Sequence, residues 1–205
     1  IKTAVIASAF IAGLLSLSST AMAQNGPGIV YDLGGKFDKS FNEAAFNGAE
    51  KFKKDGGGDY AEFELTNEAQ REQALRNMAR RGANIVVAVG FTQASSLEKV
   101  AAEFPNIKFT IIDGVVNLPN VQSVLFKEHE GSFLVGVAAS MASKSNKVGF
   151  VGGMDVPLIR KFALGYEEGA KYANPRTEVF QNMTGTTPAA WNDPTRGAEL
   201  ALSQF

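Results

Sequence analysis

The sequence predicts an α/β protein of two lobes with similar topology, each a parallel sheet covered by helices on both faces. Two observations predict this class. Short apolar runs alternate with helix-like segments along the chain, which is the order found in parallel sheets with helices on both sides. The opening pattern of strand, loop and helix also recurs 121 positions later, as expected for two lobes that begin alike.

The strands are predicted from continuous apolar runs. Most of these runs are rich in valine, isoleucine and phenylalanine, which is typical of strands buried on both faces. They cover residues 28–33, 60–65, 84–89, 108–113, 121–126, 147–152 and 177–182.

Helices are predicted between these strands. In residues 67–84 the apolar side chains of Leu75 and Met78 fall on one stripe, as on the buried face of a helix. Asn67 is the expected N-cap and Gly82 the expected residue just after the helix end. Residues 93–104 and 130–143 are predicted to be helical as well.

The first 23 residues have the pattern of a secretory signal. Lys2 precedes an apolar stretch, and small residues end at Ala21-Met22-Ala23, so the mature chain is expected to begin at Gln24. The alternative is a membrane anchor, for which the stretch is short. Because the chain starts at Ile1 and not at Met, we expect the true start to lie upstream.

Composition excludes several classes of function. The absence of cysteine removes disulfides, thiolate catalysis and thiolate metal sites. A net charge of -1, with no basic run, argues against a nucleic-acid partner. His129 is the only histidine, so no histidine metal site is expected, and we read it as a surface or hinge residue. No nucleophile with a base beside it is recognisable, so neither an enzyme nor a cofactor is expected.

The internal repeat points to a ligand site between the lobes. Residues 28–35 align with 149–156, Phe41 aligns with Phe162, and a Gly-Ala pair follows each phenylalanine at the same distance. Ligands of open parallel sheets bind beyond the carboxyl ends of the strands, so the two rings would face one another across a cleft. Two facing aromatics suit a flat ring. The alternative is that each ring packs on its own sheet.

Polar residues stand at the same strand ends. Asp32 and Asp113 each end an apolar run, where a carboxylate can accept hydrogen bonds from a ligand or cap the following helix. Asn42 could contact a ring edge or close the turn. Trp191 lies in a Pro-rich loop, where we expect it to pack within the loop, although it could line the cleft.

Several segments resemble the basic membrane protein family, the substrate-binding components of ABC transporters that include purine nucleoside receptors. The resemblance extends over nearly all of residues 28–205. It is carried by "DKSFNEAAFNGAEKF", "FTIIDG", "EGSFLVGVAASMAS" and "KVGFVGGMDVPLIRKFALGYEEGAKYANP".

The resemblance implies a type I periplasmic-binding-protein fold, as in sugar receptors, with a purine nucleoside in the cleft. By position it implies that Phe41 and Phe162 stack on the base. Asp32, Asn42 and Asp113 would hydrogen-bond to it, and Gly90 and Phe91 would lie at the cleft edge. It further implies a monomer in the periplasm that delivers its ligand to a membrane permease.

The chain departs from the family in two ways. "AMAQ" stands where many relatives carry a lipid-modified cysteine, so we expect a free periplasmic receptor. The family is also longer, so residues 24–127 are expected to form the N-terminal lobe and residues 128–205 the start of an incomplete second lobe. A hinge is expected near residues 127–131, and the ribose-binding residues of the family would lie beyond Phe205.

Two other functions stay open on the sequence alone. One is a sugar-binding or sensory protein of the same fold, because aromatic rings also stack on sugars and nothing in the residues separates sensing from transport. The other is a nucleoside hydrolase that uses Asp32 and Asp113 as acid and base. The lack of an accompanying nucleophile or metal cluster argues against the enzyme.

Overall fold

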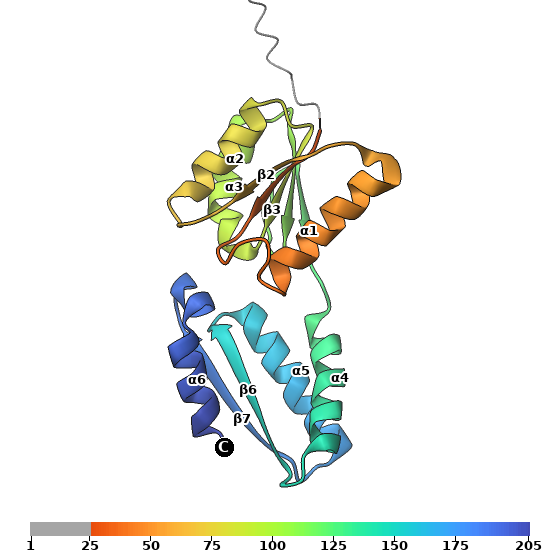
Figure 1. The fold of residues 1–205 in the computed structure, drawn as a ribbon, viewed down its shortest axis with the longest axis vertical. Helices are drawn as coiled ribbons and strands as arrows, with labels where there is room; N and C mark the ends of the chain where they lie inside the picture. Colours follow the sequence, from red (N-terminus) through yellow and green to blue (C-terminus); the bar gives the residue numbers. More distant parts are fainter. Residues whose placement is uncertain (1–25) are drawn as a thin grey trace, which may run out of the picture.

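The computed structural model describes residues 26–205, which form two lobes, each with its own sheet (Figure 1). The predicted signal segment, residues 1–23, lies outside the described residues. All strand pairs in both sheets are parallel. The α/β class predicted from the sequence is therefore confirmed.

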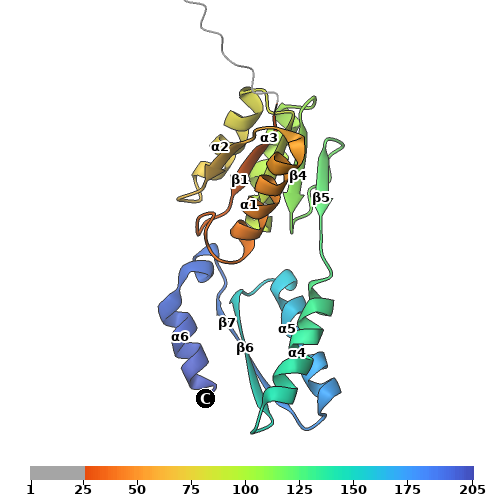
Figure 2. The ribbon, with the colours of Figure 1, turned by 45° about the vertical axis from the view of Figure 1, so that its right-hand side comes forward.

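The first lobe contains a five-stranded sheet in the order β2-β1-β3-β4-β5. Each strand falls within a run predicted from the sequence. The strands are β1 (Gly28–Tyr31), β2 (Ala61–Glu64), β3 (Ile85–Val89), β4 (Lys108–Ile112) and β5 (Val121–Val124). Because the strands are parallel, their carboxyl ends share one edge, and this edge faces the second lobe (Figure 2).

Helices cover both faces of this sheet. α2 (Gln70–Arg80) and α3 (Ala94–Glu103) pack on one face around the buried side chains of Leu75, Leu97 and Phe109. α1 (Phe41–Phe52) covers the other face against Ile29, Tyr31 and Val89. A π-helical segment (Lys53–Gly57) and a short 3₁₀ helix (Phe91–Gln93) complete the lobe.

The start of α2 differs from the prediction. The helix begins at Gln70, and Asn67 contributes its backbone carbonyl to a turn, accepting from the Gln70 amide at 3.3 Å. The Gln70 side chain reaches back and accepts from the Thr66 amide at 2.9 Å, which ties the helix start to the preceding turn. The N-cap position is Ala69, and no side chain makes a capping bond there. The predicted end is confirmed, because Gly82 follows the helix with φ of 80°.

The second lobe is built on a two-stranded parallel sheet, β6 (Lys147–Met154) and β7 (Glu178–Gly185). α4 (Glu128–Ala142) and α5 (Pro157–Ala173) lie on one side of it and α6 (Pro194–Ser203) on the other (Figure 1). A short 3₁₀ helix (Pro188–Asn192) precedes α6. The carboxylate of Asp193 caps α6 by accepting from the Arg196 amide at 2.9 Å.

α4 and α5 pack with their backbones in close approach, because glycines lie at the crossing. A Cβ atom at Gly136 would collide with the carbonyl of Tyr166, and one at Gly169 would collide with the carbonyl of Phe133. The repeat partner of Gly169 is Gly48 in α1, which has open space around it. The Gly-Ala pair recurs in the sequence, but it serves this close packing only in the second lobe.

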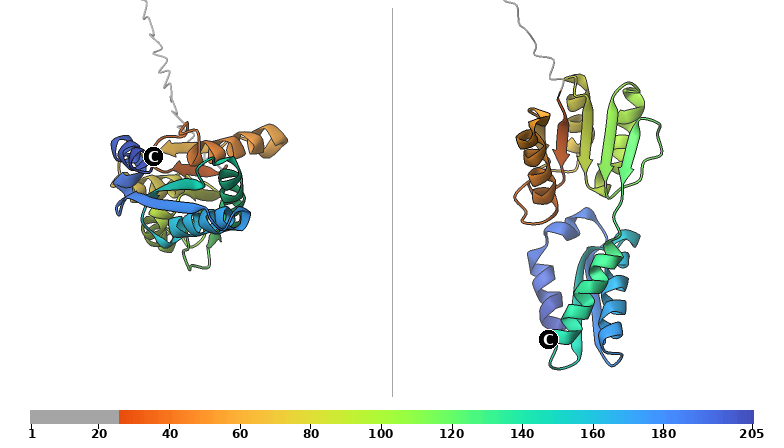
Figure 3. Two further views of the ribbon diagram at one scale, coloured as in Figure 1. Left: turned by 90° about the horizontal axis from the view of Figure 1, so that it is seen from below. Right: turned by 90° about the vertical axis from the view of Figure 1, so that its right-hand side faces the viewer.

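The chain passes between the lobes through residues 125–127, between β5 and α4 (Figure 3). All strands of the first sheet precede this segment and both strands of the second follow it. We therefore propose residues 24–127 and 128–205 as the two lobes. The hinge is proposed in residues 125–127 and not across residues 127–131 as expected, because α4 already begins at Glu128. Among residues 26–205, no helix is both long and apolar enough to cross a membrane.

We predict that Gly169→Ala destabilises the second lobe. The added methyl group meets backbone atoms that cannot rotate away, so the helices must separate, at a cost of about 1–3 kcal/mol or more. The melting temperature should fall by about 2–4 °C for each kcal/mol of stability that is lost. Gly131→Ala, at an open position in α4, is the matched control and should leave stability unchanged or raise it. Equal melting temperatures of wild type and Gly169→Ala would show that the helices do not pack this closely.

Candidate ligand-binding site

A cleft of about 520 Å³ lies between the lobes, within the size range of small-molecule sites. Its first wall is formed by the carboxyl ends of β1, β3 and β4 and by the start of α1, and its second wall by β6, α5 and the 3₁₀ helix before α6. All seven residues predicted from the sequence line it. They are Asp32, Phe41, Asn42, Gly90, Phe91, Asp113 and Phe162.

The "DKSFN" segment builds the entrance to α1. The Asp38 carboxylate accepts hydrogen bonds from the backbone amides of Ser40, Asn42 and Glu43 at 2.8–3.1 Å. In return, Glu43 accepts from the Lys39 amide at 3.0 Å. These bonds satisfy amides that would be orphaned at a helix start. The segment therefore fixes where Phe41, the first residue of α1, enters the cleft.

Asn42 closes the turn between β1 and α1. Its side chain is buried, with 1% exposed, and accepts from the Asp32 amide at 3.1 Å. Its amide group donates to the carbonyls of Asp32 and Gly35 at 3.0 and 3.1 Å, with a longer contact to Leu33. The turn-closing role that the sequence left open is thus observed, and these backbone partners engage both polar atoms of the side chain.

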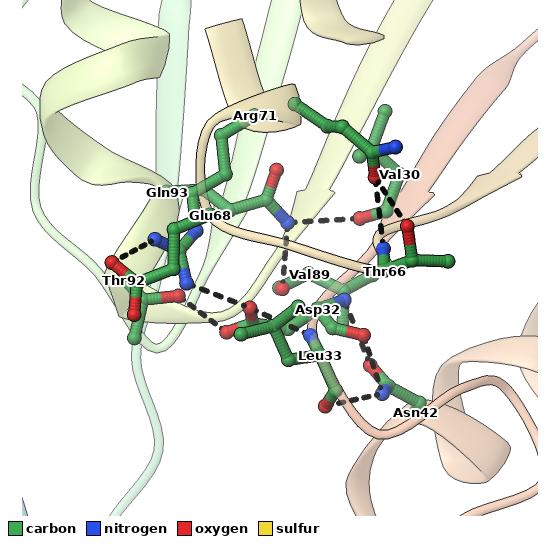
Figure 4. A network of polar contacts seen from close by, with 11 residues as sticks. Val30, Asp32, Leu33, Asn42, Thr66, Glu68, Arg71, Val89, Thr92 and Gln93 are labelled. Carbon is green, nitrogen blue, oxygen red and sulfur yellow. Dashed lines mark hydrogen bonds and ion pairs between the residues drawn. The ribbon is translucent and has the colours of Figure 1, made fainter. Parts of the chain in front are cut away.

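Asp32 joins three segments of the first lobe (Figure 4). One carboxylate oxygen accepts from the Leu33 amide at 2.8 Å and lies 3.5 Å from the Arg71 guanidinium. The other accepts a short hydrogen bond from the Thr92 hydroxyl. The carboxylate therefore fixes the end of β1 relative to α2 and to the turn after β3, and it does not cap α1.

Gly90 is required by the position of Asp32. Its φ is 107°, which L-residues rarely adopt, and a Cβ atom there would lie 2.6 Å from a carboxylate oxygen of Asp32. The turn is completed by Gln93, a fully buried residue whose side chain donates to the carbonyls of Val30 and Val89 at 3.0 and 2.8 Å. Phe91 is held at the cleft edge by this turn.

Among the three aspartates that line the cleft, Asp113 is the one whose carboxylate has no protein partner within residues 26–205. It is half-buried at the end of β4 and adopts a left-handed backbone with φ of 61°. Burial raises the pKa of its carboxyl group above the usual value, and the negative charge of Glu128 raises it further. A hydrogen-bond donor on a ligand would relieve this unfavourable environment.

The aromatic pair of the repeat lies on opposite walls, since Phe41 belongs to the first lobe and Phe162 to the second. Both rings are partly buried. Phe41 also packs against the Ile29, Tyr31 and Val89 cluster of its own sheet, so the packing weighed as its alternative role is observed, and the residue lines the cleft as well. Three further rings line the cleft, those of Phe91, Phe150 and Trp191.

The charges of the cleft favour a neutral ligand that donates hydrogen bonds. Its charged lining residues are Asp32, Asp38, Asp113 and Arg71. Arg71 is directed to carboxylates, at 3.5 Å from Asp32 and 3.4 Å from Glu68, so it does not offer a free cationic site. A phosphorylated ligand would meet carboxylates with too little positive charge to balance it.

A family model described as an ABC transporter substrate-binding protein, PnrA-like (Bmp), matches residues 28–205. The chain belongs to this family. The resemblance carried by the "DKSFN" and "EGSFLVG" segments is therefore confirmed.

Relatives of the chain support the Bmp assignment. The "CD4+ T-cell-stimulating antigen" of Listeria monocytogenes is 32% identical over 86% of this chain and 50% of its own length. The "ABC transporter nucleoside-binding protein BmpA" of Lactococcus lactis is 30% identical over 86% of this chain and 51% of its own length. The chain thus spans about half the length of the curated relatives it matches.

A solved structure shows the same fold. An ABC transporter solute-binding protein from Aeropyrum pernix superimposes with a TM-score of 0.74 and 33% identity, over 87% of this chain and 52% of the other. The type I periplasmic-binding-protein fold implied by the resemblance is confirmed. The Bmp family is a family of substrate-binding components of transporters and not a family of enzymes.

Several cleft residues were missed by sequence reasoning. Arg71 sits inside a helical pattern and Thr92 in a turn, and neither carries a local signal that it faces the end of β1. Trp191 was expected to pack within its loop, but it lines the cleft because its ring lies over Gly153 of β6.

We predict that Asn42→Ala destabilises the first lobe by about 2–4 kcal/mol. The substitution removes three hydrogen bonds to the part-buried backbone of Asp32 and Gly35, each worth about 0.5–1.5 kcal/mol. Urea unfolding measures the change, and amide exchange at residues 32–36 should accelerate. Asn47→Ala, at an exposed position of the same helix, should change stability by less than about 0.5 kcal/mol. Equal losses in both variants would contradict the turn-closing role.

We predict that Asp113→Asn stabilises the protein at pH 7. The folded-state pKa of this carboxyl lies above its ordinary value of 3.8. The protein is therefore most stable when the group is protonated, and it loses stability as the pH rises through the folded-state pKa. The gain in melting temperature should therefore shrink toward pH 4. Asp59→Asn is a control with the opposite expectation. Lys53 lowers the pKa of that exposed carboxyl, so removing its charge should not raise the melting temperature at pH 7. No gain at pH 7 would show that Asp113 is not strained in the unliganded cleft.

Proposed function

We propose that this Bmp-family protein binds a purine nucleoside between its lobes and delivers it to a membrane permease. The observation that carries the proposal is the position of Phe41 and Phe162 on opposite walls of one cleft, with Asp113 unpartnered beside them. A purine offers two flat faces for the rings and N–H groups for the carboxylate. Stacking on an aromatic side chain is worth about 1–3 kcal/mol per base.

The chemistry of the lining supports a nucleoside over a nucleotide. Three aspartates and one arginine line the cleft, and the arginine faces Asp32 and Glu68. The ligand is therefore expected to be neutral. The name of the Lactococcus lactis relative, a nucleoside-binding protein, is consistent with this ligand class.

The transport role rests on closure of the lobes. Substrate-binding proteins close around their ligand at a hinge, and residues 125–127 are the crossing between the lobes within the described chain. We propose that the closed form of a monomer, free in the periplasm, is the species that the permease recognises. A sensory protein that feeds a receptor would use the same closure.

A sugar or other small solute is the second candidate ligand. Aromatic rings also stack on sugars, and the carboxylates of the cleft can accept bonds from hydroxyl groups. The number of rings in the lining, five in all, favours the flat and less polar base.

The test is calorimetric titration of the protein expressed to its natural stop codon. Inosine, guanosine and adenosine should bind with micromolar or tighter affinity, whereas ribose and inosine monophosphate should bind much more weakly. Phe41→Ala and Phe162→Ala should each weaken nucleoside binding by about 5- to 150-fold, the loss of one stacking contact. Phe52→Ala, at the exposed far end of α1, is the matched control and should bind as wild type.

The titration also separates the alternatives. Heat with ribose or another sugar, and none with any nucleoside, would replace the proposed ligand by a sugar. Appearance of free base from inosine during incubation would overturn the binding-protein proposal in favour of an enzyme.

A further inference from the structure

Phe91 and Trp191 form an aromatic contact that joins the two lobes. Their ring centroids lie 6.3 Å apart with an interplanar angle of 68°, an edge-to-face arrangement within the favourable range for aromatic pairs. Phe91 begins the 3₁₀ helix after β3, and Trp191 lies in the 3₁₀ helix before α6. Both rings line the cleft.

This contact is distinctive because the other specific interactions stay inside one lobe. Among residues 26–205, every side-chain hydrogen bond, ion pair and cation–π contact joins groups of the same lobe or of the connecting segment, and Phe91–Trp191 is the aromatic pair that crosses the cleft. The relative position of the lobes therefore depends on few contacts.

Trp191 is positioned by its own lobe. Its ring covers Gly153 of β6, where any side chain would collide with it. The hydroxyl of Thr184 in β7 lies 2.8 Å from the carbonyl of Ala190 and 3.1 Å from that of Gly153. Its single proton is shared between these two acceptors, which links the tryptophan's helix to the sheet. Trp191 is still 45% exposed, and its ring contacts Phe91 of the first lobe.

Phe91 is positioned independently by the first lobe. Gly90 donates its amide to the carbonyl of Ile112 at 3.1 Å, and the backbone at Phe91 approaches Gly114 so closely that a Cβ atom there would lie 3.2 Å from the Phe91 Cα. The buried Gln93 side chain anchors the same turn to β1 and β3. Each ring is thus carried by its own lobe.

We propose that Phe91 and Trp191 form a latch that sets how much of the protein is closed, and through this its ligand affinity. Two rings fixed on separate lobes meet at only one lobe separation, so their contact stabilises that state alone. An aromatic pair of this kind shifts an equilibrium by about two- to twelvefold. Apparent affinity falls in proportion when the binding-competent fraction falls. The effect on ligand affinity rests on the proposed function, whereas the effect on how much of the protein is closed does not.

The first arm of the test uses no ligand. Trp191 is the only tryptophan of this sequence, and any tryptophan beyond it in the natural protein is replaced by phenylalanine. Phe91→Leu should shift the Trp191 emission to longer wavelength and increase its quenching by acrylamide. The radius of gyration from small-angle scattering should rise as the open state gains population. Phe52→Leu, the same substitution at the far end of α1, should change none of these.

The second arm measures ligand affinity in a double-mutant cycle. Inosine is titrated into wild type, Phe91→Leu, Trp191→Leu and the double variant. A latch predicts that each single variant binds about two- to twelvefold more weakly and that the double variant is no weaker than the weaker single one, because the pair is lost only once. Losses that multiply in the double variant would mean two independent ligand contacts and would overturn the latch.

The two arms separate the latch from the nucleoside proposal. If emission, quenching and radius of gyration are the same in wild type and Phe91→Leu, the latch is wrong whatever the ligand is. If these readouts change while wild type binds no nucleoside, the nucleoside proposal fails and the latch stands.

Discussion

The buried side chain of Asn42 determines how the first wall of the cleft is built. It bonds to the backbone of Asp32 and Gly35 and so fixes the turn between β1 and α1. That turn holds the Asp32 carboxylate, which accepts a hydrogen bond from Thr92 and pairs with Arg71 on two other segments. A buried polar group without partners costs about 1–3 kcal/mol, so these bonds leave the turn little freedom to take another path.

The second wall depends on small residues more than on polar bonds. Gly136 and Gly169 let α4 and α5 approach closely, and Gly153 leaves space for the ring of Trp191. The two lobes repeat a strand, a loop and a helix, yet they position their aromatic residues by different means. This difference follows from the chemistry, because a polar turn fixes a residue through directional bonds, whereas close backbone packing fixes it through excluded volume.

Most of the fold could be predicted from the sequence, because buried parallel strands are continuous apolar runs and each observed strand lies in or close to such a run. The cleft residues at strand ends were also accessible, since parallel strands bring their carboxyl ends to one edge. Arg71 and Thr92 were not, because their partner Asp32 lies 39 and 60 positions away. The predicted start of α2 was wrong, because Asn67 forms a turn through its backbone carbonyl and the helix begins only at Gln70.

The acids of the cleft divide into two kinds, and the division bears on how a ligand is held. Asp38 and Asp32 are occupied by backbone amides, a hydroxyl and a guanidinium, so they shape the wall whether or not a ligand is bound. Asp113 has a raised pKa and no side-chain partner within residues 26–205, so no protein group compensates its desolvation. A donor that arrives with the ligand would offset that cost only when the lobes have closed and water has been removed. Binding free energy would thereby be concentrated in the closed state, which is what the proposed delivery of ligand to a permease requires.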